Sequence, residues 1–157
     1  MSQTITIHFI KNDKTLTNKP EPGTRPVIKV TINPSSGDDH CISINEKKKS
    51  VFALVDTGAD DFYVDEELVN ELGLPLKTGV KSTRLISGVT ETESTQHNAI
   101  MKIDDINKSF GVSLTKIKTS SFGFHYQVIL GMSLIRLGKL TMDSVNNIYT
   151  LTLPDEI

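Results

Sequence analysis

Asp56 is the residue whose surroundings point most clearly to chemistry. It follows an apolar run at residues 51–55 and is itself followed by Thr57, Gly58 and Ala59. A strand that ends in a Thr-Gly turn would hold a carboxylate at the edge of the core, because turn amides fix its orientation and the glycine admits another backbone. The threonine hydroxyl can also hydrogen-bond to a partner. An ordinary loop aspartate is the alternative, since three residues recur by chance, so the context decides.

The elements around Asp56 are predicted to be mostly strands. Short runs rich in Val, Ile and Thr alternate with turns at intervals too short for repeated helices. Residues 51–55 are apolar at every position, which predicts a central strand covered on both faces. Further strands are expected at residues 4–10, 27–33, 41–44, 81–86, 90–97, 99–103, 110–117, 126–130, 139–143 and 148–153.

Two short helices are predicted among these strands. Asp65 can cap a helix that ends at Gly73, because three apolar residues recur between them at helical spacing. The other helix is expected at residues 132–137, closed by Gly138.

The sequence resembles the retropepsins, the protease family of retroviruses, retrotransposons and related cellular proteins, at three places in the right order. Residues 52–61 resemble the catalytic strand and loop of that family. Residues 128–131, Val-Ile-Leu-Gly before a short helix, resemble its second signature, which braces the catalytic loop. Between them, residues 85–90 lie where the flap hairpin of the family would be, with Gly88 at the tip. Three ordered matches over residues 51–138 are far more specific than any one.

This resemblance implies a mostly β fold, a closed β-barrel-like acid-protease fold with one short C-terminal helix, in which each subunit contributes half of a site. Residues 26–157 are expected to form the protease domain, and residues 1–25 an N-terminal strand and flexible arm. The arm contains Pro20, Pro22 and Gly23, which predict no regular structure there.

The resemblance also implies a role for individual residues. Asp56 would be the catalytic carboxylate, Thr57 would lock together the two loops of a dimer, and the carbonyl of Gly58 would accept a substrate amide. The positions implied to contact substrate are Ala59, Asp60, Asp61, Ile86, Ser87, Gly88, Val89 and Ile129.

One position departs from the family pattern. Many viral members have an arginine directly after the second-signature glycine, where it pairs with the residue that matches Asp60. Met132 occupies that position here, and Arg136 lies one helical turn further along. The sequence leaves open how Asp60 is supported.

A single aspartate cannot perform the implied reaction. One carboxylate must take a proton from water while a neighbouring protonated carboxyl donates one to the peptide carbonyl. The chain has no second Asp-Thr-Gly, and Asp143 lacks the following glycine. The partner is therefore expected to be Asp56 of a second subunit, which makes the predicted protein a homodimer.

Composition excludes several other classes of function. Seventeen basic against nineteen acidic residues give a net charge of -2, without the basic excess of a nucleic-acid binder. No stretch approaches the roughly 20 apolar residues of a membrane span, and the start of the chain lacks a signal-peptide pattern, so we expect a cytoplasmic protein. Cys41 is the only cysteine, so no internal disulfide is possible.

No cofactor or metal is expected. Asp38, Asp39, His40 and Cys41 are metal-ligand types, but adjacent residues point in different directions and seldom converge on one ion. Ser133 lies outside any Gly-x-Ser-x-Gly elbow, so a serine hydrolase has no support.

The sequence thus predicts a homodimeric aspartic endopeptidase, a hydrolase acting on peptide or protein substrates. The alternative is a catalytically silent retropepsin-like module for dimerisation or peptide binding, because a fold does not guarantee a function. A generic β-barrel binding protein would require three ordered matches to be coincidence.

Overall fold

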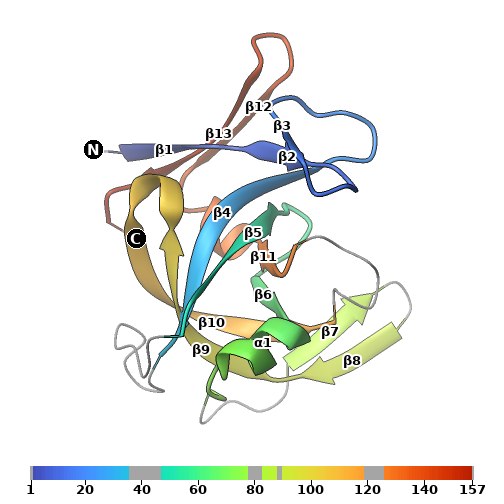
Figure 1. Cartoon of the computed structure of the whole chain (residues 1–157), viewed down its shortest axis with the longest axis vertical. Helices are drawn as coiled ribbons and strands as arrows, with labels where there is room; N and C mark the ends of the chain where they lie inside the picture. The colour runs from blue at the N-terminus through green and yellow to red at the C-terminus, as the bar shows by residue number, and fades with distance from the viewer. Residues whose placement is uncertain (1, 36–46, 78–82, 88–89, 119–125, 157) are drawn as a thin grey trace.

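The computed structural model of the chain describes residues 2–35, 47–77, 83–87, 90–118 and 126–156, with backbone alone at 83–87 and 90–93. Figure 1 shows strands that form a closed barrel, with short helices on its outside. The barrel strands, in ring order, are β4 (Arg25–Pro34), β5 (Lys49–Val55), β11 (Val128–Leu130), β6 (Phe62–Asp65), β10 (Lys108–Ile117) and β9 (Gln96–Ile103). Pairing of β4 with β9 closes the ring, which confirms the predicted mostly β, barrel-like fold.

Alternating side chains along the long strands fill the barrel. In β4, Ile28, Val30 and Ile32 are buried, while the lysine and threonine between them are more exposed. Burial of each such side chain contributes roughly 1.5–3 kcal/mol. The core is completed from β9 and β10 by Ala99, Met101, Ile103, Val112 and Leu114.

The predicted central strand is confirmed as β5, which lies between β4 and β11. Its last three residues, Ala53, Leu54 and Val55, are all buried. β4 pairs with residues 49–54 of β5 and β11 pairs with residues 53–55, so the end of the strand is held on both sides immediately before Asp56.

Both predicted helices are present. In α1 (Glu66–Leu72), the Asp65 side chain accepts a hydrogen bond from the Glu67 amide at 3.2 Å, and Gly73 ends the helix with a φ of 64°. That left-handed conformation explains the glycine. The second helix, α2 (Met132–Ile135), is shorter than the predicted 132–137. A 3-10 turn, η1 (Asp104–Ile106), joins β9 to β10.

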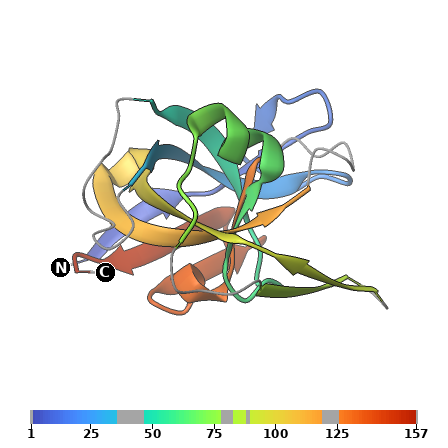
Figure 2. The ribbon, with the colours of Figure 1, turned by 90° about the horizontal axis from the view of Figure 1, so that it is seen from below.

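The chain ends form a separate sheet in the order β1 (Ser2–Thr6), β13 (Ile148–Pro154) and β12 (Lys139–Asp143). In both ribbon views the two termini lie near each other (Figures 1 and 2). The predicted single strand at residues 4–10 is instead two, β1 and β2 (His8–Ile10), because the chain leaves one sheet at Ile7 and joins the other.

The expectation of no regular structure in the N-terminal arm is wrong at one place. β3 (Leu16–Thr17) pairs with β2 and extends the barrel sheet beyond β4. Pro22 and Gly23, with a φ of 81°, lie in a turn, and Pro20 lies outside any helix, strand or turn, so these three residues form no regular structure, as predicted. Phe9 of β2 belongs to the same core as the barrel strands. The mobility of the arm stays a prediction.

The predicted polar hairpin is present as β7 (Thr83–Ser87) and β8 (Thr90–Ser94), which pair in antiparallel register. It projects from the barrel away from the terminal sheet (Figures 1 and 2). Gly88 and Val89 lie outside the described residues, as does the strand predicted at 41–44. Among described residues, no helix is long and apolar enough to cross a membrane.

Candidate active site

The loop at residues 56–61 encloses the end of β11. It leaves β5 and returns along β6, and β11 lies between them, parallel to β5 and antiparallel to β6. Leu130, the last residue of β11, pairs with Val55 on one side and Phe62 on the other. The loop and the start of α2 are therefore in contact, through hydrogen bonds between residues 59–61 and 131–133.

Asp56 is held by hydrogen bonds on both its backbone and its side chain. Its amide donates to the Leu130 carbonyl at 3.0 Å, and its Oδ1 accepts from the Gly58 amide at 2.8 Å. The amide of Ala59 closes the turn by donating to the Asp56 carbonyl at 3.3 Å. A half-buried carboxylate in a fixed orientation results.

Gly131 is a glycine because two backbone carbonyls occupy the space of a side chain. A Cβ there would lie 2.5 Å from the carbonyl oxygens of both Ala59 and Asp61. Its amide donates to the Asp61 carbonyl at 3.0 Å, and the next amide, of Met132, donates to the Ala59 carbonyl at 2.8 Å. The start of α2 thus braces the loop through its backbone.

Ser133 adds a side-chain anchor that the sequence did not predict. Its amide and its hydroxyl both donate to the Asp60 carbonyl, each at 2.9 Å, and the hydroxyl lies 3.1 Å from Asp61 Oδ1. The same Oδ1 accepts from the Phe62 amide at 2.8 Å. Only its place two residues after the second-signature glycine could have drawn attention to Ser133.

The segment around Asp60 is held in place without an arginine. Within the described ranges, no ion pair joins Arg136 to Asp60, whose side chain is exposed. Backbone contacts and Ser133 hold this stretch instead. Thr57 is likewise exposed.

The other predicted substrate positions lie on two further elements. Ile129, in β11, is half-buried between Leu54 and Tyr63. Ile86 and Ser87 lie in β7, in backbone register with β8. The roles given to these residues stay predictions.

Burial, together with the negative charge of the loop, raises the pKa of two nearby tyrosines, Tyr63 and Tyr126. Burial raises the pKa of the Tyr63 phenol above its ordinary 10.0, and the carboxylates of Asp61 and Asp60 raise it further. Burial likewise raises the pKa of Tyr126, where Arg25 opposes and Asp56 reinforces the shift. Both phenols therefore stay neutral beside the carboxylates, and the sequence predicted neither as a neighbour of this charge.

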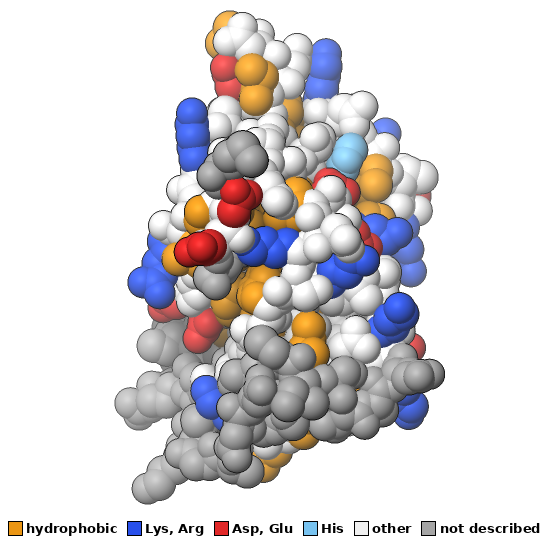
Figure 3. Space-filling model, turned by 90° about the vertical axis from the view of Figure 1, so that its left-hand side faces the viewer, with side chains coloured by type: hydrophobic (Ala, Val, Ile, Leu, Met, Phe, Trp, Pro, Cys, Tyr) orange, Lys and Arg blue, Asp and Glu red, His pale blue; other side chains and the backbone are white. Residues whose placement is uncertain are grey.

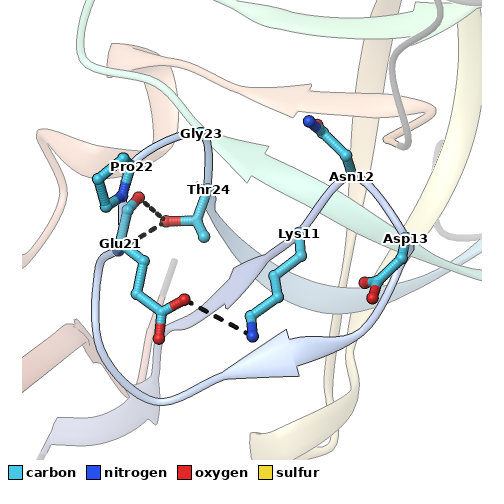
Figure 4. A pocket seen from close by; sticks show the side chains of 7 residues that line it. All are labelled: Lys11, Asn12, Asp13, Glu21, Pro22, Gly23 and Thr24. Atoms are coloured by element: carbon cyan, nitrogen blue, oxygen red, sulfur yellow. Dashed lines mark hydrogen bonds and ion pairs between the residues drawn. The ribbon is translucent and has the colours of Figure 1, made fainter.

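Elsewhere, the structure offers little competing chemistry. No group of three or more His, Cys, Asp or Glu residues that could hold a metal occurs in the described ranges, and residues 38–41 lie outside them. A polar hollow of about 330 Å³ is lined by residues 11–13 and 21–24. Figure 4 shows these residues, with the Lys11–Glu21 ion pair beside the hollow. No predicted site residue lines it.

Comparison with known proteins is consistent with this geometry. The family model of the gag-polyprotein putative aspartyl protease matches residues 41–137. A crystal structure of a retropepsin-like aspartic protease from Rickettsia conorii is 19% identical, with a TM-score of 0.55, and the match covers 98% of this chain and 92% of that chain.

A second solved structure, the retroviral protease-like domain of Ddi1 from Leishmania major, is 15% identical, with a TM-score of 0.41 and coverage of 83% of this chain and 96% of that one. The search of curated proteins finds no match. At 19% identity, the Rickettsia structure supports the fold alone.

Proposed function

The chain belongs to the family of gag-polyprotein putative aspartyl proteases, and from this premise we propose that it is a homodimeric aspartic endopeptidase. Its substrates would be peptides or proteins, and it would use no cofactor. The observation that carries the proposal is Asp56 at the end of β5, with Oδ1 fixed by the Gly58 amide at 2.8 Å.

The proposed reaction needs a second carboxyl beside the first. Two such groups about 3 Å apart share one proton because both cannot ionise together. The ionised member takes a proton from water, and the protonated member donates one to the oxygen of the scissile carbonyl. Water attacks the carbonyl carbon to give a tetrahedral diol. As the carbon–nitrogen bond breaks, the carboxyl that took the proton from water passes it to the departing nitrogen. The other carboxylate takes a proton back from a hydroxyl of the diol, which leaves an amine, a carboxylic acid and a singly protonated pair.

Asp56 of a second subunit is the proposed second carboxyl. Thr57 follows it directly and its side chain is exposed in the single chain, as a residue that hydrogen-bonds across a subunit interface would be. A two-fold axis beside this loop would place both copies of Asp56 together.

Substrate would lie extended between this loop and the β7–β8 hairpin. We propose that Gly58 and Ala59, with Asp60 and Asp61, bind its backbone and side chains, and that Ile129 contributes an apolar wall. The hairpin, including Gly88 and Val89, would cover the bound peptide.

A proteome-scale digest tests this proposal. Denatured cell protein is incubated with the wild-type chain and with Asp56→Asn, in the presence of EDTA, and new termini are read by mass spectrometry. We expect new termini with the wild type alone. A folded dimer that makes none across an acidic to neutral pH series would instead support the catalytically silent module.

A further inference from the structure

Ser133 connects two segments that are far apart in the sequence. Its hydroxyl reaches the Asp60 carbonyl at 2.9 Å and Asp61 Oδ1 at 3.1 Å, across a separation of more than 70 residues. These contacts place one hydroxyl between the backbone and the carboxylate of the substrate-facing half of the loop.

A purely local role does not explain this hydroxyl. Ser133 is the second residue of α2, whose N-cap, Gly131, makes no side-chain capping bond. A serine side chain caps its own helix from the N-cap position, which Gly131 occupies here. Here the hydroxyl is directed away from the helix, to the loop.

The contacts of Ser133 are separate from those that orient the catalytic carboxylate. Asp56 is held by Gly58 and Leu130, and neither hydrogen bond involves Ser133. The Asp61 carboxylate, in contrast, is held by Ser133 and by the Phe62 amide. Loss of the hydroxyl would therefore free residues 60–61 and leave Asp56 in place.

We propose that Ser133 is a positioning residue for substrate binding. It fixes residues 60 and 61 against α2 and so replaces the missing arginine after Gly131. The inference rests on the proposed function, because it assigns these two residues to the substrate. A hydrogen bond to a charged group is worth enough to change an affinity by about ten-fold when it is lost.

The test compares three variants of the 157-residue chain on one cleaved peptide. Ser133→Ala removes the hydroxyl, and Ser133→Thr retains one. Ser50→Ala is the control, because Ser50 lies in β5, the strand that leads to Asp56, and its hydroxyl hydrogen-bonds to Thr31 at 2.7 Å and not to the loop. We expect Ser133→Ala to raise KM about ten-fold with kcat and both limbs of the pH profile unchanged. Ser133→Thr should return KM to near the wild-type value, and Ser50→Ala should leave it unaltered.

Amide hydrogen exchange provides a readout that does not need activity. In Ser133→Ala, the amide of Phe62 should exchange faster than in the wild type and in Ser50→Ala, because the carboxylate that accepts from it loses its second anchor. Unchanged exchange, unchanged KM, or a fall in kcat alone would each overturn the positioning role. A wild-type protein without turnover would overturn the proposed function instead, and the exchange experiment would still decide the anchoring by Ser133.

Discussion

Asp56 gains its orientation from its own turn and from the end of β11. Because the Gly58 amide holds Oδ1, replacing the carboxylate by an amide changes the acid–base group more than the shape. Asp56→Asn should abolish peptide hydrolysis, because the uncharged amide cannot take a proton from water. Initial rates on a cleaved peptide, with circular dichroism to check the fold, measure this. Substantial turnover by a folded variant would remove Asp56 from the mechanism.

Of Gly58 and Gly131, Gly131 should tolerate a side chain less well. Gly131→Ala places a Cβ 2.5 Å from two backbone oxygens that cannot easily move, so the variant should lose about 1–3 kcal/mol of unfolding free energy. Gly58→Ala is the matched comparison, because its Cβ would lie 3.2 Å from a single side-chain oxygen of Asp56. Urea unfolding of both variants measures the difference. Equal losses would show that the contact between loop and helix is looser than described.

Among single residues, the sequence singles out those whose neighbours along the chain form a recognisable motif. Asp56 was identifiable from its turn and from the apolar strand before it. Ser133 was not, because its importance depends on where α2 meets a loop more than 70 residues earlier. Tyr126 escaped prediction for the same reason, since its proximity to Asp56 is a property of the fold.

Among the elements, the insertion of β11 between β5 and β6 matters most for the site. β5 and β11 were predicted from their apolar runs, and α1 from its cap and final glycine, but β6 and the two-residue β3 were not predicted. The ring order was not derivable from residue patterns, because parallel pairing such as that of β5 with β11 joins segments about 75 residues apart. The split of the first strand at Ile7 was missed because the apolar alternation continues through the break.

His97 links the start of β9 to the segment that follows α1. Its Nδ1 lies 3.0 Å from the Leu74 carbonyl and its Nε2 lies 2.8 Å from the Thr95 hydroxyl. Burial lowers the pKa of His97 below its ordinary 6.5, and the charge of Lys116 lowers it further, while the bond to Leu74 opposes the shift. The neutral ring is therefore favoured in the folded protein.

The stability of the fold should consequently depend on pH through His97. A depressed pKa contributes stability that is present above 6.5 and is lost as the pH falls through the folded pKa, because the unfolded chain binds the proton first. Each unit of depression corresponds to about 1.4 kcal/mol. His97→Gln should flatten the loss of unfolding free energy below pH 6.5, measured by urea titration at several pH values.

His8→Gln serves as the control for this measurement, because His8 lies half-exposed beside Asn18. It should keep the wild-type slope. An equally steep acid loss in His97→Gln would assign the dependence to other groups.

In the whole molecule, the central strand of the terminal sheet is paired on both edges within one chain. β1 pairs with one edge of β13 and β12 with the other. One described face mixes charges of both signs with hydrophobic side chains between them (Figure 3), as a net charge of -2 would suggest.

Removal of residues 148–157 should therefore unfold the protein. The deletion takes away the central strand of the sheet with the buried side chains of Tyr149, Leu151 and Leu153. Their combined burial, at roughly 1.5–3 kcal/mol each, is comparable with the 5–15 kcal/mol stability of a typical domain. Loss of the thermal transition in circular dichroism is expected. Deleting residues 155–157 alone should preserve it, and a cooperatively folded 1–147 fragment would contradict this account of β13.

The closed barrel and the family could be predicted from the sequence because three motifs occur in the expected order between residues 52 and 131. How two copies of the chain would meet in the proposed dimer could not be predicted, because that contact depends on surfaces that only the folded chain brings together. The shared pair of Asp56 carboxylates is therefore the central claim that most needs a direct test.

That test is a mixing experiment between wild type and Asp56→Asn. After subunit exchange, confirmed with a mass-tagged variant, a ten-fold excess of the variant leaves only about one wild-type chain in eleven with a wild-type partner, if pairing is random. Peptide hydrolysis per wild-type chain should then fall about ten-fold, because mixed dimers hold one aspartate. Activity that stays unchanged after complete exchange would show that each chain carries its own catalytic pair and would contradict the shared site.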